Sequence, residues 1–286
     1  MVSVPFIRRL FKKKKITRYI DNNNGLLELE KNLSKVKILG IDTEFDWRTT
    51  YFPTLSIIQI AIKNKLFLVD CLKVSPKETL KFYLENEEYL KVFHSVRSDT
   101  NVLSKCLGIN TKNVFDIQIS DKLIRNDEIR AYGKIVNQYF GIHLKKSETN
   151  SNWLKRPLSV DQIDYALDDV DYLLEIFKYQ KRKLIRSSLY NQAAIKSNEE
   201  SELGNKSLKI LRLKKQEKKL SKRNRDIFLW REEIAEADNI PPAFIFKDKY
   251  LNKLSNISSD DNLANKKIMT ILGDSKLTEL FISSFL

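Results

Sequence analysis

The chain has 286 residues, of which 42% are hydrophobic and 31% charged, and its net charge is +14. This composition fits a globular protein with one large domain or with one medium and one small domain, and no apolar run reaches the roughly 20 residues of a membrane span. The N-terminus reverses the order of a secretory signal and the two cysteines lack zinc-like spacing, so we expect a cytoplasmic protein with reduced thiols.

The first predicted strand ends in two carboxylates. The apolar run 37–45 has the composition of a buried strand, and Asp42 and Glu44 stand two residues apart near its end. Side chains alternate along a strand, so both carboxylates project to one face and Thr43 projects to the other. Two anions so close together repel each other and resist desolvation unless a cation joins them.

The segments that follow predict alternating strands and helices. Two apolar runs, 55–62 and 66–71, flank a short polar turn and predict an antiparallel hairpin. Further along, the pattern predicts a helix at 76–90, a strand at 91–96, a helix at 99–107 capped by Ser98 or Asp99, a strand at 113–117 and helices from 118 to 188. This order predicts an α/β fold with a mixed sheet and flanking helices, and it resembles the ribonuclease H-like fold.

Charge and composition divide the chain into four parts. We expect a basic N-terminal arm (1–24), an α/β domain (25–196), a basic linker or helix (197–225) and a small all-α domain (226–286). Residues 1–20 carry seven Lys or Arg and no acid, and residues 206–225 carry ten against one acid, so the other 246 residues have a net charge of about −2. Confined basic charge favours contact with a polyanion at 206–225, whereas the arm suits nucleic acid and anionic lipid about equally.

A cation joining Asp42 and Glu44 needs further ligands. Hard cations such as Mg²⁺ prefer oxygen, and a two-ion site needs three or four carboxylates. Only two histidines occur, His94 and His143, so zinc sites and histidine-dependent triads are poorly supplied. Asp99 follows the strand 91–96 and is the first candidate.

The predicted helix 161–171 supplies the second candidate. Tyr165 and Asp169 are four residues apart and share a face, where a carboxylate and a phenol can hold a metal ion and a water. The other aspartates of this helix suit a cap or a solvated face; they are Asp161, Asp164, Asp168 and Asp171.

Three segments in order resemble the motifs of the DEDD 3′→5′ exonuclease superfamily: Asp42-Thr-Glu44, His94-Ser-Val-Arg-Ser-Asp99 and Tyr165-Ala-Leu-Asp-Asp169. The last has the spacing of the DEDDy branch. Segments 47–59 and 146–158 are similar to ribonuclease D, and the resemblance covers about residues 25–190. A single Asp-x-Glu motif would be weak evidence for this family, but three motifs in order with these flanking segments are specific to it.

A second resemblance lies in the predicted all-α domain. Trp230-Arg-Glu-Glu-Ile-Ala and Ile240-Pro-Pro-Ala-Phe-Ile-Phe-Lys-Asp248 resemble a helicase-and-RNase-D C-terminal (HRDC) domain, a small nucleic-acid-binding module. We expect one such module here, whereas many bacterial members of the family carry two. The basic segment 206–225 would partly compensate for the second.

The superfamily resemblance implies a metal-dependent hydrolase. Two Mg²⁺ or Mn²⁺ ions about 4 Å apart would be held by four carboxylates, with Asp42 bridging them; the four are Asp42, Glu44, Asp99 and Asp169. One ion would activate a water and the other would stabilise the leaving 3′ oxygen. Tyr165, neutral near pH 7, would orient the attacking water.

Several residues are candidates for binding the nucleic acid itself. Phe45, Trp47 or Tyr51 could stack on terminal bases, with packing as the alternative. Lys146 and Arg156, together with Arg97, could meet phosphates, although solvated surface fits them equally well. We expect His94 to be structural.

These features together favour a 3′→5′ exoribonuclease that releases nucleoside 5′-monophosphates from single-stranded RNA ends, and the family suggests 3′ processing of tRNA precursors. We expect no stable membrane insertion and predict no protein partner. Three alternatives remain: a DNA exonuclease of the same superfamily, a catalytically inactive nucleic-acid-binding protein, and a membrane-surface protein anchored by residues 1–20.

Overall fold

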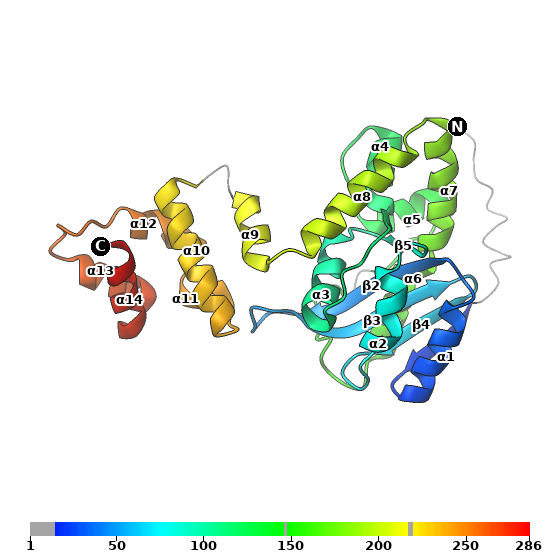
Figure 1. Cartoon of the computed structure of the whole chain (residues 1–286), viewed down its shortest axis with the longest axis horizontal. Helices are drawn as coiled ribbons and strands as arrows, with labels where there is room; N and C mark the ends of the chain where they lie inside the picture. Colours follow the sequence, from blue (N-terminus) through cyan, green and yellow to red (C-terminus); the bar gives the residue numbers. More distant parts are fainter. Residues whose placement is uncertain (1–14, 146–147, 217–219) are drawn as a thin grey trace. The chain divides into compact units, whose positions relative to one another are not determined.

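The computed structural model of the chain describes residues 15–145, 148–216 and 220–286. It forms two compact units (Figure 1). The N-terminal unit extends to Lys206 but leaves out the loop Trp47–Pro53, which belongs with Ser207–Leu286 in the C-terminal unit. Across the described ranges, every helix is too short or too polar to span a bilayer.

A six-stranded mixed sheet forms the centre of the N-terminal unit. Its order is β1-β4-β3-β2-β5-β6. Strands β2, β3 and β4 are antiparallel neighbours, β5 and β6 run parallel to β2, and β1 runs parallel to β4. The bounds are β1 Ile16–Ile20, β2 Ile38–Asp46, β3 Thr54–Ile62, β4 Lys65–Asp70, β5 Leu90–Phe93 and β6 Val114–Asp116. The predicted α/β fold with a mixed sheet is confirmed.

Part of the predicted N-terminal arm belongs to this sheet. Residues 16–20 form the edge strand β1, which pairs with β4 from Ile16 to Ile20. Helix α1 (Asn23–Leu33) also begins inside the predicted arm, with Asn22 as its side-chain cap. The strand escaped prediction because four of its five residues are exposed and its apolar alternation is weak. Residues 1–14 of the arm lie outside the described ranges.

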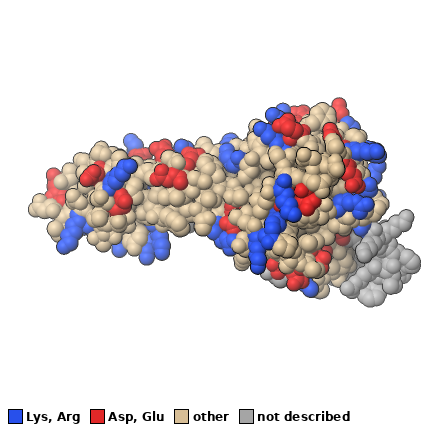
Figure 2. All heavy atoms as spheres, turned by 90° about the horizontal axis from the view of Figure 1, so that it is seen from below, with Lys and Arg blue, Asp and Glu red and all other residues tan. Residues whose placement is uncertain are grey.

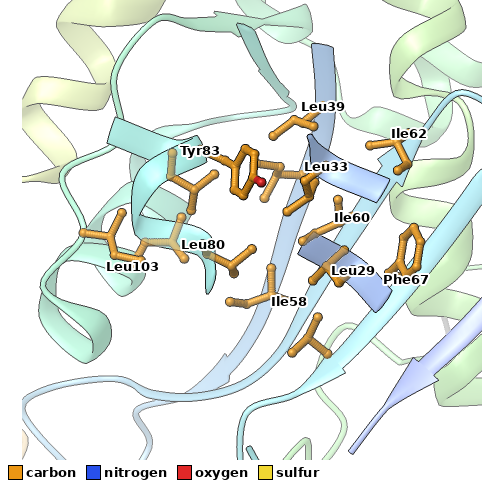
Figure 3. Packing of buried hydrophobic residues seen from close by; sticks show 14 of the residues in the cluster. Leu29, Leu33, Leu39, Ile58, Ile60, Ile62, Phe67, Leu80, Tyr83 and Leu103 are labelled. Atoms are coloured by element: carbon orange, nitrogen blue, oxygen red, sulfur yellow. The ribbon is translucent and has the colours of Figure 1, made fainter. Parts of the chain in front are cut away.

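One face of the sheet packs against helices α1, α2 (Lys77–Glu85) and α3 (Arg97–Leu107). Side chains that alternate along the central strands supply the sheet side of this core. Figure 3 shows them meeting the apolar stripes of the helices; the labelled residues are Leu29, Leu33, Leu39, Ile58, Ile60, Ile62, Phe67, Leu80, Tyr83 and Leu103. Helix α2 ends at Glu85, earlier than the predicted residue 90.

The opposite face packs against α6 (Val160–Asp171) and α7 (Leu173–Arg186), with α4 (Ile117–Arg125) and α5 (Tyr132–Phe140) joining the same core. A Cβ on Gly40 of β2 would lie 3.3 Å from the Cβ atoms of both Ala61 and Leu173. Glycine therefore lets α7 approach the middle of the sheet closely. This face also receives the even-numbered residues of β2, which include both motif carboxylates.

The polar run predicted as the start of a linker is the second half of helix α8 (Tyr190–Gly204). Its small polar side chains are buried and hydrogen-bonded: Ser201 Oγ donates to the Thr111 carbonyl at 3.0 Å. Asn101 of α3 donates to the Gly204 carbonyl at 2.7 Å. Residues 197–204 are therefore no linker but a helix packed against α3, because paired hydroxyls can replace apolar contacts at a close helix crossing.

A buried ion pair fixes the loop that leads into α6. The Nε and Nη2 atoms of Arg156 donate to the two carboxylate oxygens of Asp70, each at 2.7 Å, and the Tyr19 hydroxyl donates at 2.6 Å. Arg156 also donates to Ser56 Oγ at 3.0 Å. Burial opposes ionisation of Asp70, but hydrogen bonds from Arg156 and Tyr19 hold its pKa below the ordinary value. The pair joins the end of β4 to the approach of α6.

The C-terminal unit is helical. Its elements are α9 Leu208–Gln216, α10 Lys222–Ala237, α11 Pro242–Ile245, a 3₁₀ turn at Asp248–Tyr250, α12 Leu251–Ser255, α13 Ala264–Leu272 and α14 Ser275–Phe285. Trp230 of α10 packs edge-on against Phe281 and Phe285 of α14, with ring centroids 5.4 and 6.1 Å apart. Loop residue Tyr51 is buried in the same core.

Replacing Arg156 with Met should lower the free energy of unfolding by about 3 kcal/mol, because Asp70 would remain buried without its cation. The measurement is urea denaturation, with Lys155→Met as the matched control at an exposed neighbouring position. The double variant Asp70→Leu/Arg156→Met should recover much of the loss. A loss no larger than that of the control would contradict a structural role for this pair.

Candidate metal centre

Three carboxylates converge at the end of β2. Asp42, Glu44 and Asp169 each offer an oxygen, and these oxygens lie within 4.8 Å of one another. The first two share one face of β2, and α6 carries the third over that face. All three side chains are partly exposed, so the cluster has one side open to solvent.

Asp99, the fourth predicted carboxylate, approaches from the other face of the sheet. It lies in the first turn of α3 and is only 4% exposed. The Thr43 hydroxyl donates to its carboxylate at 2.7 Å. Asp99 lies outside the compact group of three, but its charge raises the pKa of both Asp42 and Glu44. The four predicted carboxyls therefore gather at the end of β2 and approach it from both faces of the sheet, and the role of Asp99 as a metal ligand stays a prediction.

The turn before α3 is held by a second buried carboxylate. Asp116 accepts hydrogen bonds from the backbone N–H groups of Ser95 at 3.1 Å and Val96 at 2.9 Å. Ser95 has a φ of +64°, a left-handed conformation that is uncommon for a residue other than glycine. Helix α3 begins at Arg97, so neither Ser98 nor Asp99 is the cap expected from the sequence. The constrained turn instead sets where Asp99 enters the site.

The electrostatics of the four carboxyls favour a bound cation. Burial, followed by repulsion from Asp99 and Asp169, raises the pKa of Asp42 well above its usual range. Burial and the same two neighbours raise the pKa of Glu44 to about 9, and burial raises the pKa of Asp99 and of Asp169 to about 7. Within the described ranges none of the four forms an ion pair with Lys, Arg or His. The donor set thus offers oxygen ligands and excess negative charge, which fits a divalent metal.

Tyr165 lies one helical turn before Asp169 on α6. Its hydroxyl lies close enough to Asp169 to lower the pKa of that carboxyl, and it hydrogen-bonds to Thr149 Oγ1 at 3.4 Å. Partial burial and the charge of Asp169 raise the pKa of Tyr165 above its ordinary value. The phenol is therefore neutral near pH 7, and its role in orienting a water stays a prediction.

Two of the residues predicted to bind nucleic acid instead make contacts within the protein. Tyr51 is fully buried under the Arg212 guanidinium in the C-terminal unit, so the prediction that it stacks on a base is wrong. Its backbone N–H donates to Asn239 Oδ1 at 3.1 Å. Arg156 is held by Asp70, so the prediction that it contacts phosphate is also wrong. Arg97, a weaker candidate, forms an ion pair with Glu200.

The other candidates for nucleic-acid binding differ in accessibility. A bulge between Glu44 and Phe45 sets Phe45 opposite Leu55. The half-buried ring of Phe45 packs against the core between the sheet and helices α1, α2 and α3. Trp47 is 47% exposed and keeps an accessible surface. Lys146 lies outside the described ranges. Stacking on a base thus stays a prediction for Phe45 and Trp47.

Comparison with known proteins places the chain in one family. Residues 17–185 match the sequence profile of the 3′-5′ exonuclease family. Ribonuclease D of Desulfotalea psychrophila is 29% identical over 262 residues, which cover 88% of this chain and 70% of that protein. Ribonuclease D of Sphingobium indicum is 29% identical over 81% of this chain and 62% of its own length. The crystal structure of Escherichia coli RNase D superposes with a TM-score of 0.79 at 22% identity, covering 93% of this chain and 74% of that one.

The raised pKa values predict how stability depends on pH. The folded protein holds protons that the unfolded chain releases above its ordinary carboxyl pKa of 4.5 for Glu44 and 3.8 for Asp169. Unfolding therefore releases protons between about pH 4 and 9, and these groups make the protein less stable as the pH rises through that range. In EDTA, the free energy of unfolding should fall from pH 5 to pH 9, and Mg²⁺ should flatten this dependence.

The variant Glu44→Gln isolates the contribution of Glu44 to the pH dependence of the free energy of unfolding. The variant should be more stable than the wild type at pH 9 in EDTA, whereas Glu199→Gln, at an exposed position on α8, should match the wild type. Urea midpoints at pH 5, 7 and 9 provide the comparison. If the urea midpoints of the wild type and of Glu44→Gln changed equally with pH in EDTA, the raised pKa of Glu44 would be contradicted.

Proposed function

The chain belongs to the 3′-5′ exonuclease family, and from this premise we propose that it is a metal-dependent 3′→5′ exoribonuclease that releases nucleoside 5′-monophosphates from RNA. The observation that carries the proposal is the convergence of Asp42, Glu44 and Asp169, with Asp99 beside them and Tyr165 on the same helix face. RNA as the substrate is supported by the relatives named ribonuclease D. The family resemblance suggests tRNA precursors, and these are the proposed physiological substrate.

The four carboxylates would hold two divalent ions, Mg²⁺ or Mn²⁺. When bound, such ions lower the pKa of a coordinated water and stabilise the leaving oxygen. Asp42 lies close enough to the other three carboxylates for their charge to raise its pKa, and together with them it would hold the ions. The Tyr165 hydroxyl lies close enough to Asp169 to lower the pKa of that carboxyl, and it would orient the attacking water.

Basic residues of the C-terminal unit would contact the RNA backbone. Several basic side chains of segment 206–225 are occupied within the unit: Lys209 pairs with Glu236 at 3.3 Å and Arg212 pairs with Glu232 at 2.9 Å. The exposed Lys214, Lys215 and Lys222 are the better candidates for phosphate. On the face shown in Figure 2, basic and acidic side chains are interspersed. We therefore expect the RNA backbone to meet separate basic side chains rather than one continuous basic patch.

The C-terminal unit is the proposed HRDC-like module. Its helices and its partly buried Trp230 suit a small independently packed domain. In place of the four divisions expected from the sequence, we propose a nuclease domain that extends to Lys206 and a nucleic-acid-binding module that begins at Ser207. A cytoplasmic location and the absence of a protein partner also stay predictions.

Metal-ligand variants test the catalytic assignment. Asp42→Asn and Asp169→Asn should each lower kcat/KM on a 3′-hydroxyl single-stranded RNA by about 10³-fold, since metal ligation supplies several kcal/mol of transition-state stabilisation. Asp164→Asn makes the same change at an exposed position of α6 and should keep wild-type activity. Activity retained by Asp42→Asn would rule out the metal centre.

Matched substrates test the specificity with the same purified proteins. RNA and DNA oligonucleotides of one sequence, together with a 3′-extended tRNA, should show faster release of 5′-monophosphates from RNA and shortening of the tRNA extension. Faster degradation of DNA would instead identify a DNA exonuclease.

Tyr165→Phe should slow catalysis without weakening metal binding. Loss of the hydroxyl should lower kcat by about 10²-fold, because the attacking water would lose its orienting hydrogen bond. Calorimetric titration should give a Mg²⁺ affinity close to that of the wild type, and Tyr190→Phe on α8 serves as the control. A fall in metal affinity with unchanged kcat at saturating metal would assign the phenol to the metal site instead.

A further inference from the structure

A glutamine on β3 faces the carboxylate cluster. Gln59 pairs with Asp42 in the antiparallel register of β2 and β3, so the two side chains project to the same face of the sheet. Glu44 lies two residues further along β2 on that face. The Gln59 side chain has no exposed surface. It therefore lies beneath α6, next to the proposed metal ligands and shielded from solvent.

The surroundings of Gln59 are otherwise apolar. Its neighbour on the same face of β3 is Ile57, its partner on β4 is Leu68, and both pack against Ala166 of α6. The other polar residue in the middle of β3, Ser56, is satisfied because its hydroxyl donates to the Trp153 carbonyl. A leucine or methionine would suit position 59 better if packing alone were required.

The Gln59 amide lacks the partners that buried amides usually have. Neither its nitrogen nor its oxygen has a hydrogen-bond partner in good geometry among the described residues. The amide nevertheless lies close enough to Glu44 to lower the pKa of that carboxyl. An unsatisfied buried amide is destabilising, so its presence needs a reason other than stability.

We propose that Gln59 is a positioning residue: when a cation occupies the site, its otherwise unpartnered amide donates a hydrogen bond to the Glu44 carboxylate and fixes the orientation of that carboxylate toward Asp42 and Asp169. A neutral amide is suited to this role. A lysine or arginine at this position would repel an incoming cation, whereas an apolar side chain would leave the Glu44 rotamer free. The inference rests on the proposed metal-dependent function and assigns the support of one ligand to a residue outside the three motifs.

The experiment compares Gln59→Met with the wild-type full-length chain. In EDTA, the free energy of unfolding should be unchanged or higher, because an unsatisfied amide is removed. Mg²⁺ affinity, measured by calorimetric titration, should fall about 10- to 100-fold, the range typical of residues that orient metal ligands. Activity on single-stranded RNA should require correspondingly more Mg²⁺.

A second buried glutamine provides the matched control. Gln180 of α7 is also unexposed, and its amide donates to the Ile117 carbonyl at 3.0 Å. Gln180→Met should therefore lose stability in EDTA while keeping wild-type Mg²⁺ affinity. The two variants are expected to change opposite properties, which a general packing effect would not produce.

Three outcomes would overturn the inference. If Gln59→Met bound Mg²⁺ as tightly as the wild type, the proposed role of Gln59 would be wrong, while the proposed metal centre would stand. Loss of folding in both Gln59→Met and Gln59→Leu in EDTA would make the residue structural. No Mg²⁺ binding by the wild-type chain would overturn the proposed function and this role together.

Discussion

The site depends on one unfavourable interaction, the repulsion among four carboxyls gathered at the end of β2. Burial raises their pKa values, and within the described ranges no basic side chain offsets their charge. A fold does not hold such an arrangement for stability, because each group would be better solvated or paired. A divalent cation would relieve this repulsion, so the same arrangement that costs stability would favour metal binding.

The rest of the N-terminal unit holds these charges in place from two directions. On one face of the sheet, Asp116 fixes the turn before α3, and Thr43 anchors the Asp99 carboxylate. On the other face, the Asp70–Arg156 pair fixes the approach of α6, which carries Asp169. The alternation of side chains along β2 connects the two faces, because consecutive residues of one strand reach both helices. A cation at the strand end can therefore recruit ligands from both layers.

Much of the candidate centre followed from short-range patterns. Alternation along a strand placed Asp42 and Glu44 on one face, and a four-residue spacing placed Tyr165 with Asp169. The residues expected to bind nucleic acid were harder to assign, because their roles depend on distant partners. From the sequence, Tyr51 fits a residue that stacks on a base as well as it fits a core residue. In the structure it is buried by helices near the C-terminus. Arg156 meets Asp70 from 86 positions away in the chain, which no local pattern reveals.

The sequence by itself determined the α/β order, the carboxylate motifs and the resemblance to ribonuclease D, because periodicity and motif spacing are properties of neighbouring residues. Only the tertiary structure decided that residues 16–20 extend the sheet, that the polar run after residue 197 is a packed helix, and that Gln59 faces Glu44. Each of these depends on pairing between segments far apart in the chain. A side chain's type fixes what it can bind, but burial and available partners fix what it does bind.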